Sequence, residues 1–480
     1  MNNKKQQAQA FLGLALLGGL MVAAGSAQAG AFMTPTTNAA GWGRAFGGGS
    51  LFKDDPSSAY NNPAAMAFID KNISQFTLNY ANIDIKYKGA AYDYSGRPTS
   101  STTLDPDTFE PLYTERTGNG GQAGFEAWVP TGFLVMPINE RLNFGLSQVV
   151  PMGARTSYDD DWKGRDFAVD TKIETVAITG SLSFKVTDDF SIGGGAILQH
   201  TSGFLSRNVD LYAAAAQSTD LGNIPFAAGQ GFSLMRVKVD NTSLGWFAGI
   251  AWQVTPQDRL GLNYHAKIKN KLEGRYNLYA DPASRAIMTT PVIDGKTLVE
   301  LAYPGLTLNP DGANATSRLD IPANASLDWV HEFTDRLAVG VSATWTDWSS
   351  FKALTLKSNG NNIVSIPYRY KDAWQISVGG DYRMTDDLTL RTGVSFDQTP
   401  TPDATRDPSI PDGDRTFVSL GFGYKVRAVP GLSIDGAYSH QFVETVKLRT
   451  ENVDRLGGAT LDGKSKARGD VVSASLTYEF

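Results

Sequence analysis

From about residue 73 to the last residue, the chain repeats short stretches in which apolar and polar side chains alternate. The terminal stretch is the clearest, because Val472, Leu476 and Phe480 share one parity while Ser473 and Thr477 take the other. A period of two is typical of a β-strand with one apolar face, and stretches of about ten residues are typical of membrane-crossing strands. Fourteen stretches of this kind are present: 73–88, 131–137, 142–150, 172–185, 190–198, 244–252, 260–272, 319–329, 337–345, 374–382, 388–396, 418–426, 432–438 and 472–480.

Long and short connections alternate along this series, with long loops expected at 89–127, 202–240 and 275–316. An even number of strands, short turns at one end and long loops at the other are typical of outer-membrane barrels. Closing the sheet removes its edges, which lipid does not tolerate. We therefore predict an all-β fold, a 14-stranded antiparallel transmembrane β-barrel over residues 73–480. A soluble β-sandwich is the alternative, and it leaves the aromatic strand ends unexplained.

Two irregularities interrupt the alternation. In the first stretch the apolar parity changes near Ala81 and Asn82, which predicts a β-bulge. The third stretch runs into Pro151 and Gly153. Because proline donates no hydrogen bond to a ladder and is confined to edges, ends or bulges, we predict a break in strand pairing there.

The segment from Gly30 to about residue 72 is different in kind. It keeps no sustained period and is rich in Gly, Pro, Asn and Asp, including the run from Gly41 to Gly49. These residues supply turns and close backbone approaches. A short irregular segment before a long series of strands predicts a plug inside the barrel lumen, which we call the hatch.

The first 29 residues have the pattern of a signal peptide. Lys4 and Lys5 precede an apolar core from Phe11 to Ala24, and Ala27 and Ala29 form a small-x-small cleavage site. Cleavage after Ala29 gives a mature start at Gly30, and an uncleaved membrane anchor is the alternative. With the barrel, this predicts a location in the bacterial outer membrane.

Composition narrows the function. The net charge is −6, and removing the signal peptide with its two lysines makes it −8, which argues against a nucleic-acid partner. The absence of cysteine excludes disulfides and thiolate metal sites. Forty-nine glycines and 11% aromatic residues at only 41% hydrophobic content fit a barrel with lipid outside and a polar lumen inside.

Candidate binding chemistry is sparse. On the polar parity of the seventh stretch, His265 is followed by Lys267, Lys269 and Lys271. These lysines either form a solvated lumen wall or attract a carboxylate headgroup. Aspartates at 159–161, or Asp412 with Asp414, are either solvated or hold a cation at the outer rim. We predict no resident metal and no cofactor.

Catalysis is not indicated. The chain has four histidines and no Gly-x-Ser-x-Gly nucleophile motif, so a barrel enzyme is disfavoured. An open porin for polar solutes is the other competing class. The hatch-like start argues against it.

Several motifs together carry a resemblance to the FadL-type long-chain fatty acid transporters. They follow one another in order and span nearly the whole mature chain: Gly30-Ala31-Phe32, Gly41-Trp42-Gly43-Arg44-Ala45-Phe46, Asp54-Asp55, Asn62-Pro63-Ala64, Pro151-Met152-Gly153, Asp161-Trp162 with Gly164-Arg165, Thr346-Asp347-Trp348 with Phe351, and Ile410-Pro411-Asp412-Gly413-Asp414-Arg415.

This resemblance implies a monomeric fourteen-stranded barrel closed by an N-terminal hatch, with an outer-membrane lipid environment and a hydrophobic small molecule as cargo. It implies hatch roles for Gly30, Ala31, Phe32, Gly43, Arg44, Asn62, Pro63 and Ala64. It leaves open whether the cargo is a fatty acid or an aromatic hydrocarbon.

The physics of such a cargo favours a sideways exit. Exposing an apolar solute to a water-filled pore costs about 25 cal/mol per Å². A carrier therefore takes the solute into an apolar pocket and releases it through a gap in the barrel wall. Pro151 and Gly153 are the residues where we expect this lateral opening.

Overall fold

The computed structural model describes residues 31–93, 96–104, 111–210, 232–280, 285, 288–302, 312–451 and 459–480. The signal segment and Gly30 lie outside these residues. None of the described helices has the length and apolar character needed to cross a membrane.

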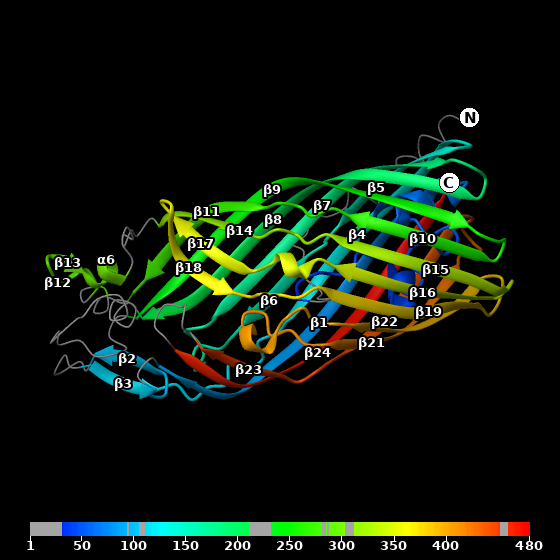
Figure 1. Ribbon diagram of the computed structural model, residues 1–480. Helices are drawn as coiled ribbons and strands as arrows, with labels where there is room; N and C mark the ends of the chain where they lie inside the picture. The colour runs from blue at the N-terminus through cyan, green and yellow to red at the C-terminus, as the bar shows by residue number, and fades with distance from the viewer. Residues whose placement is uncertain are drawn as a thin grey trace.

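One antiparallel sheet closes on itself to form the barrel (Figure 1). Closure is made by β1 (Ile73–Tyr92) and β24 (Thr460–Glu479), which pair over their whole lengths, from Ile73 opposite Glu479 to Tyr92 opposite Thr460. Six further strands are unbroken, and with β1 and β24 they make eight: β4 (Phe125–Asn139), β7 (Asp170–Lys185), β8 (Phe190–Asp210), β9 (Phe232–Gln253), β20 (Leu388–Asp397) and β21 (Arg415–Lys425).

The other six barrel strands are each interrupted, so that two labelled strands follow one path. They are β5 (Leu142–Val149) with β6 (Gly153–Ser157), β10 (Asp258–His265) with β11 (Lys271–Tyr279), β14 (Ala313–Arg318) with β15 (Asn324–Thr334), β16 (Leu337–Thr346) with β17 (Ala353–Ser358), β18 (Asn361–Pro367) with β19 (Ala373–Arg383), and β22 (Leu432–Val443) with β23 (Val446–Glu451). The fold is therefore a closed barrel of fourteen strands, as the alternation predicts.

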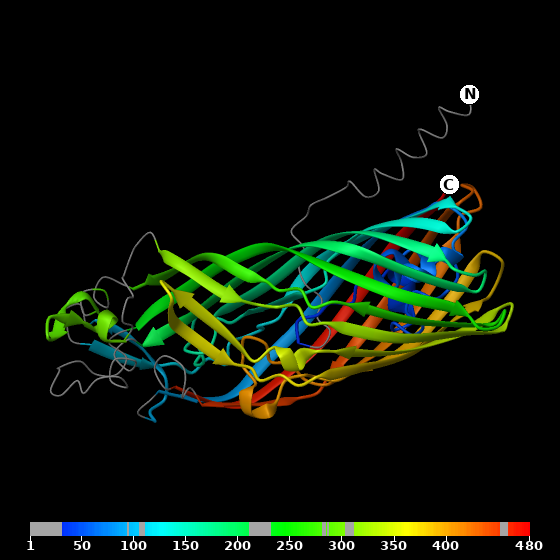
Figure 2. The same cartoon turned by 45° about the horizontal axis from the view of Figure 1, so that its top comes forward.

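The two ends of the barrel differ. Short turns gather at the end that holds the C-terminus, and long connections gather at the other (Figures 1 and 2). Because outer-membrane barrels have short periplasmic turns and long external loops, the long-loop end is extracellular. It carries the small elements β2 (Ser100–Leu104), β3 (Pro111–Glu115), β12 (Pro291–Ile293), β13 (Lys296–Thr297) and α6 (Leu298–Ala302). Of the two short 3-10 helices, η2 (Trp348–Ser350) lies within the wall between β16 and β17, and η3 (Asp403–Thr405) lies in the connection from β20 to β21.

Residues 31–72 lie inside the barrel, toward the short-turn end (Figure 1). They form α2 (Ala39–Gly43), α3 (Ser58–Asn61) and η1 (Pro63–Phe68). Side chains cap two of them: Asn38 accepts from Gly41 N at 2.8 Å at the start of α2, and Asn62 accepts from Ala64 N at 3.2 Å at the start of η1. Pro63 follows Asn62 at the first turn of η1, where its missing N–H costs nothing.

The strands extend beyond their predicted ends, so the predicted loops are too long. β8 and β9 pair from Phe190 opposite Trp252 to Asp210 opposite Phe232, which takes up both ends of the 202–240 loop. Similarly, β4 begins at Phe125, β11 continues to Tyr279 and β14 begins at Ala313.

The predicted bulge near Ala81 is wrong. The register of β1 against β24 is unbroken, and Asn79, Ala81 and Ile83 all face inward. What changes at this point is polarity: inward side chains switch from polar to apolar, and outward ones switch the other way. The strand stays regular and leaves the membrane there.

Candidate functional site

The extracellular half of the lumen is apolar. A cavity of about 60 Å³ lies between β7, β8, β9, β11, β14, β17 and β18. Its lining is almost entirely aliphatic and aromatic, and includes Ile173, Leu205, Met235, Val237, Val239, Leu272, Leu319, Leu356, Val364, Ile366, Tyr368 and Ile410. Such a lining suits an apolar ligand, since apolar surface removed from water is the main source of its binding energy.

One buried cation lies on the same inner surface. Arg207 follows Leu205 by two residues on β8, so both side chains point inward, and Arg207 is fully buried. A carboxylate entering an apolar site needs a charged or hydrogen-bonding partner, because its desolvation is otherwise costly.

The first described residues of the hatch lie next to this apolar region. Phe32 is fully buried and packs edge-on against Trp348 and Phe351, with ring centroids 4.7 and 5.6 Å apart. The backbone N–H of Ala31 donates to Asp412 at 3.0 Å. The segment Ala31–Thr34 therefore closes the lower side of the apolar half.

The same segment seals the break in the third barrel strand. Thr34 N donates to Pro151 O at 3.1 Å, and Gly153 N donates to Phe32 O at 2.8 Å. Met33 and Met152 form an antiparallel bridge between these bonds. The two halves of the strand, β5 and β6, are thus joined through the N-terminal segment.

At this break the hydrogen-bond ladder between β4 and the third barrel strand ends. β4 pairs with β5 from Asn139 up to Gly132, and its remaining part, from Phe125 to Thr131, pairs only with β1 on its other side. β6 pairs with β7 alone among the described strands. Apolar residues line the inner side, namely Phe125, Ala127, Val129 and Val150. We call this region the wall break.

Below the N-terminal segment the lumen becomes polar. A cavity of about 180 Å³ separates the hatch from the wall. Its lining includes Thr34, Thr36, Thr37, Asn61, Asn263, Ser326, Asp328, Thr344 and Gln375. Met33, Phe46, Tyr60 and Trp348 add apolar surface to this lining. A cavity of this size with so many polar groups has room for several waters and suits an apolar solute less well than the aliphatic cavity above it.

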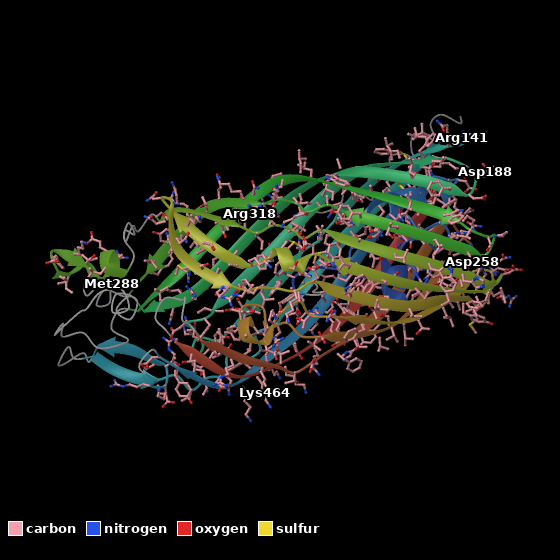
Figure 3. The ribbon with its side chains drawn as sticks, viewed as in Figure 1. Arg141, Asp188, Asp258, Met288, Arg318 and Lys464 are labelled. Atoms are coloured by element: carbon pink, nitrogen blue, oxygen red, sulfur yellow. The ribbon has the colours of Figure 1, made fainter. Side chains whose placement is uncertain are left out.

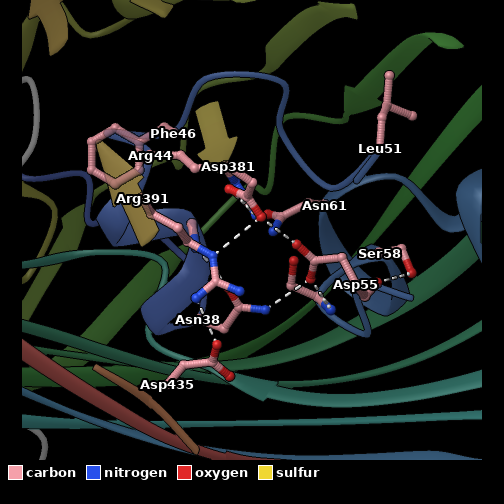
Figure 4. A network of polar contacts seen from close by, with 12 residues as sticks. Asn38, Arg44, Phe46, Leu51, Asp55, Ser58, Asn61, Asp381, Arg391 and Asp435 are labelled. Carbon is pink, nitrogen blue, oxygen red and sulfur yellow. Dashed lines mark hydrogen bonds and ion pairs between the residues drawn. The ribbon is translucent and has the colours of Figure 1, made fainter. Parts of the chain in front are cut away.

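Arg44 fixes the hatch to the wall through buried ion pairs (Figure 4). Its guanidinium lies 3.0 Å from Asp55 of the hatch and 3.2 Å from Asp381 of β19. Arg391 of β20 continues the network to Asp381 at 3.2 Å and to Asp435 of β22 at 2.7 Å. Arg44 is 2% exposed, so removing one member leaves uncompensated buried charge.

Inward-facing glycines on the wall accommodate the hatch. A methyl group built at any of them would come within about 3 Å of hatch atoms; at Gly379 and Gly393 it would lie 2.0 and 2.1 Å from the carbonyl oxygen of Arg44. We call this set the glycine belt: Gly145, Gly193, Gly249, Gly261, Gly340, Gly379, Gly393 and Gly421. It brings the hatch into close contact with eight strands, and at five of these glycines (Gly193, Gly340, Gly379, Gly393 and Gly421) the nearest hatch atoms include backbone.

The family resemblance assigns eight residues to the hatch, and Gly30 lies outside the described residues. The other seven are all buried: Ala31, Phe32, Gly43, Arg44, Asn62, Pro63 and Ala64. Asn62 also donates from Nδ2 to Ile250 O at 3.1 Å, which ties η1 to β9. Pro63 and Ala64 lie against Gly193, and Gly43 lies against Gly421.

The lysines proposed for headgroup attraction face the wrong way. The path is broken between β10 and β11, at residues 266–270, and the parity shifts there. Leu272 is 2% exposed and points inward, while the Lys271 side chain is 74% exposed and pairs with Glu273 at 2.7 Å. Lys267 and Lys269 also lie on the outer side, and Lys267 is 3.8 Å from Asp320. The alternative prediction, that these lysines form a solvated lumen wall, is also wrong, because their side chains do not face the lumen.

The other candidates are used as internal partners. His265 is 7% exposed, stacks on Phe247 with centroids 5.1 Å apart and contacts Tyr60 O at 3.0 Å. Asp412 is 5% exposed and pairs with Arg415. Within the described ranges, no group of three or more His, Asp or Glu is arranged to hold a metal ion.

Two features were not found from the sequence. Trp348, Phe351, Tyr368 and Tyr370 form an aromatic cluster, of which the sequence motifs contain only Trp348 and Phe351. The glycine belt is spread over eight strands, so its only sequence signal is the high glycine content.

Comparison with known proteins identifies the family. The family model described as outer membrane protein transport protein (OMPP1/FadL/TodX) matches residues 20–480. The crystal structure of a Pseudomonas aeruginosa FadL homologue has a TM-score of 0.88 and 62% identity, and covers 94% of this chain and 100% of its own.

More distant relatives agree. The 47 kDa outer membrane protein of Pasteurella multocida is 27% identical, with 97% of both chains covered. The long-chain fatty acid transport protein of Salmonella typhi is 27% identical, over 84% of this chain and 86% of its own. The toluene transporter TbuX of Ralstonia pickettii has a TM-score of 0.63 at 18% identity, over 92% of this chain and 98% of its own, and shows the fold alone. This chain is an outer-membrane protein and belongs to the OMPP1/FadL/TodX family of outer membrane transport proteins.

Proposed function

We propose that this protein, acting as a monomer, takes long-chain fatty acids or similar hydrophobic molecules from the extracellular side into the apolar half of its lumen. The cargo then leaves sideways into the membrane through the wall break. The observation that carries the proposal is the wall break itself, which the N-terminal segment covers from inside through backbone bonds at Pro151 and Gly153.

The axial route is closed to such a cargo. Below the apolar cavity lie the more polar cavity and a hatch in close contact with the glycine belt. An apolar molecule passing that way loses its apolar contacts and displaces a hatch held by Arg44. Shifting Ala31–Thr34 instead breaks a few hydrogen bonds and joins the apolar half to the apolar lining of the wall break.

The chemistry of the lumen favours a fatty acid over an aromatic hydrocarbon. Arg207 lies two residues along β8 from Leu205, which lines the apolar cavity, and its buried positive charge favours an anionic headgroup over a neutral ligand. The Salmonella typhi relative is itself a long-chain fatty acid transport protein.

Replacing Pro151–Gly153 with a regular alternating tripeptide tests both route and cargo. The new stretch continues the ladder toward β4, so uptake of oleate by a host lacking its own transporter should fall at least tenfold, and uptake of an alkylbenzene should be low for both proteins.

The matched control alters residues 266–268 in the break between β10 and β11, which backbone bonds from Ala266 to Trp246 and between Ile268 and Ile321 already seal. It should transport normally. Unchanged oleate uptake by the Pro151–Gly153 variant would exclude the lateral route, and dependence of the alkylbenzene alone would exclude the fatty acid.

A further inference from the structure

A cluster of lysines lies on the outer face of the barrel, where β23, β24 and β1 leave the membrane. Register places Lys447, Lys464 and Lys88 side by side on three neighbouring strands, and Lys466 directly opposite Lys86. All five are exposed, and Figure 3 shows Lys464 on the outer side of the wall. We call them the lysine patch.

Like charges directly opposite one another on a sheet are destabilising. The patch does not relieve this repulsion with its own carboxylates: within the described ranges, none of the five lysines forms an ion pair or side-chain hydrogen bond. Turning inward is no alternative, because Tyr87, Leu448 and Leu461 fill the inner face of the same strands.

Other cations at the same level behave differently. Lys172 pairs with Glu174 at 2.7 Å, Lys271 with Glu273 at 2.7 Å and Arg318 with Asp320 at 2.8 Å. In each of these pairs the acid lies two residues away on the same strand. Asp84 and Asp462 hold the same positions beside Lys86 and Lys464, but Asp84 pairs with Arg468, and Asp462 lies opposite Arg449. The two carboxylates face these two arginines as well as the lysines, so the patch keeps an excess of positive charge.

The distance of the lysine patch above the lipid-facing apolar residues indicates which kind of anion can reach it. On β24 the lipid-facing apolar side chains end at Val472, and Lys466 lies six residues further on. Six residues span about 20 Å of strand, or about 15 Å along the membrane normal for a tilt of about 40°. A phospholipid headgroup layer is only about 5–7 Å deep. A glycolipid with phosphates on its sugars reaches higher.

We propose that the lysine patch binds the phosphate groups of a phosphorylated glycolipid in the outer leaflet. Several lysines around one phosphorylated headgroup offset their mutual repulsion through charge-assisted hydrogen bonds. The site is next to the wall break, since β1, which carries Lys86 and Lys88, pairs with β4 on its other side. It depends on the outer-membrane location and not on the identity of the transported molecule.

The test compares lipopolysaccharide binding by purified protein in detergent, measured by native mass spectrometry. The variant K86Q/K88Q/K464Q/K466Q should bind at least tenfold more weakly than the unaltered protein. The matched control K172Q/K267Q/K271Q/R318Q removes four cations from the same level and should bind normally. Replacing the four patch lysines by arginine should preserve binding.

Dephosphorylated lipopolysaccharide should bind the unaltered protein at least tenfold more weakly, and millimolar inorganic phosphate should not displace the intact glycolipid. Heat-modifiable gel mobility verifies that every variant is folded. Equal binding by the patch and control variants, equal binding of the dephosphorylated lipid, or displacement by inorganic phosphate would each overturn the proposal.

Discussion

The membrane half and the extracellular half of the barrel are built from the same strands with opposite polarity. On β9, Leu244, Trp246 and Ile250 face outward in the membrane half, while Met235 and Val237 face inward in the extracellular half. The backbone alternation is continuous through the change. Each half turns its apolar side toward its apolar partner, which is lipid outside in one case and cargo and loops inside in the other.

This difference shows that the environment decides which side of a strand is apolar. A polar lumen suits the membrane half because it holds the hatch through hydrogen bonds such as Ser181 Oγ to Ala59 O and Ser191 Oγ to Ala64 O, both at 2.8 Å. An apolar lumen suits the extracellular half because it is where an apolar molecule is held. A single strand therefore contributes to hatch binding at one end and to the apolar lumen at the other.

The largest effect should come from filling the glycine belt in the membrane half. In the double variant G379A/G393A, the two methyl groups collide with the backbone of Arg44, which cannot move aside. We expect loss of the seated hatch, seen as a large single-channel conductance in planar bilayers, or loss of the heat-modifiable folded form. Gly180 faces open space, so G180A should behave like the unaltered protein. A silent conductance with normal folding in the double variant would contradict the close seating of the hatch.

A smaller effect is expected from Arg44→Ala. Breaking a buried ion pair by removing one partner costs about 3–5 kcal/mol, and here it leaves Asp55 without its cation. Urea unfolding monitored by tryptophan fluorescence should show this loss. Arg427 pairs with Asp387 at the surface with a 76% exposed side chain, so Arg427→Ala should leave the midpoint unchanged. Equal midpoints for the two variants would mean that the network in Figure 4 does not hold the hatch.

The smallest effect is expected when outward-facing residues on the two sides of the membrane boundary are exchanged between apolar and charged. Leu420 is 61% exposed in the middle of β21, and Leu420→Lys should cost about 2–4 kcal/mol, as a cation on the lipid face does near the bilayer centre. Lys466→Leu, on the outer face above the membrane, should have no measurable cost. Folding titrations into lipid vesicles measure both. A large loss for Lys466→Leu would place the membrane boundary higher than the polarity change indicates.

The fourteen strands were predictable because lipid imposes one rule on every strand that crosses it. Where lipid ends, that rule ends, and reasoning from a single parity fails. Met235, Val237 and Val239 alternate with Arg236 and Lys238, yet their parity is opposite to that of the Leu244 stretch, so the sequence was interpreted as a loop. The parity change in β1 was interpreted as a bulge for the same reason.

The site was predictable in part. The structure breaks the ladder at Pro151, as a proline at the end of a strand indicates, while the opening itself remains a proposal. The predicted direction of Lys267, Lys269 and Lys271 was wrong because the alternation was assumed to continue through residues 266–270. The strand is interrupted there, and no single residue in the sequence indicates the interruption. Arg44 pairs with Asp55 of the hatch and with Asp381 on β19, which is 337 residues away, and one sequence contains no sign of which distant carboxylate will meet it.

The glycine belt also constrains how the molecule is assembled. The hatch precedes β1 in the chain, and its clearance from the wall is smaller than a methyl group on eight strands. A hatch that fits this closely cannot enter the barrel after the barrel has closed. The hatch must already be in position when β24 meets β1, so the final seam is the step that locks it in place.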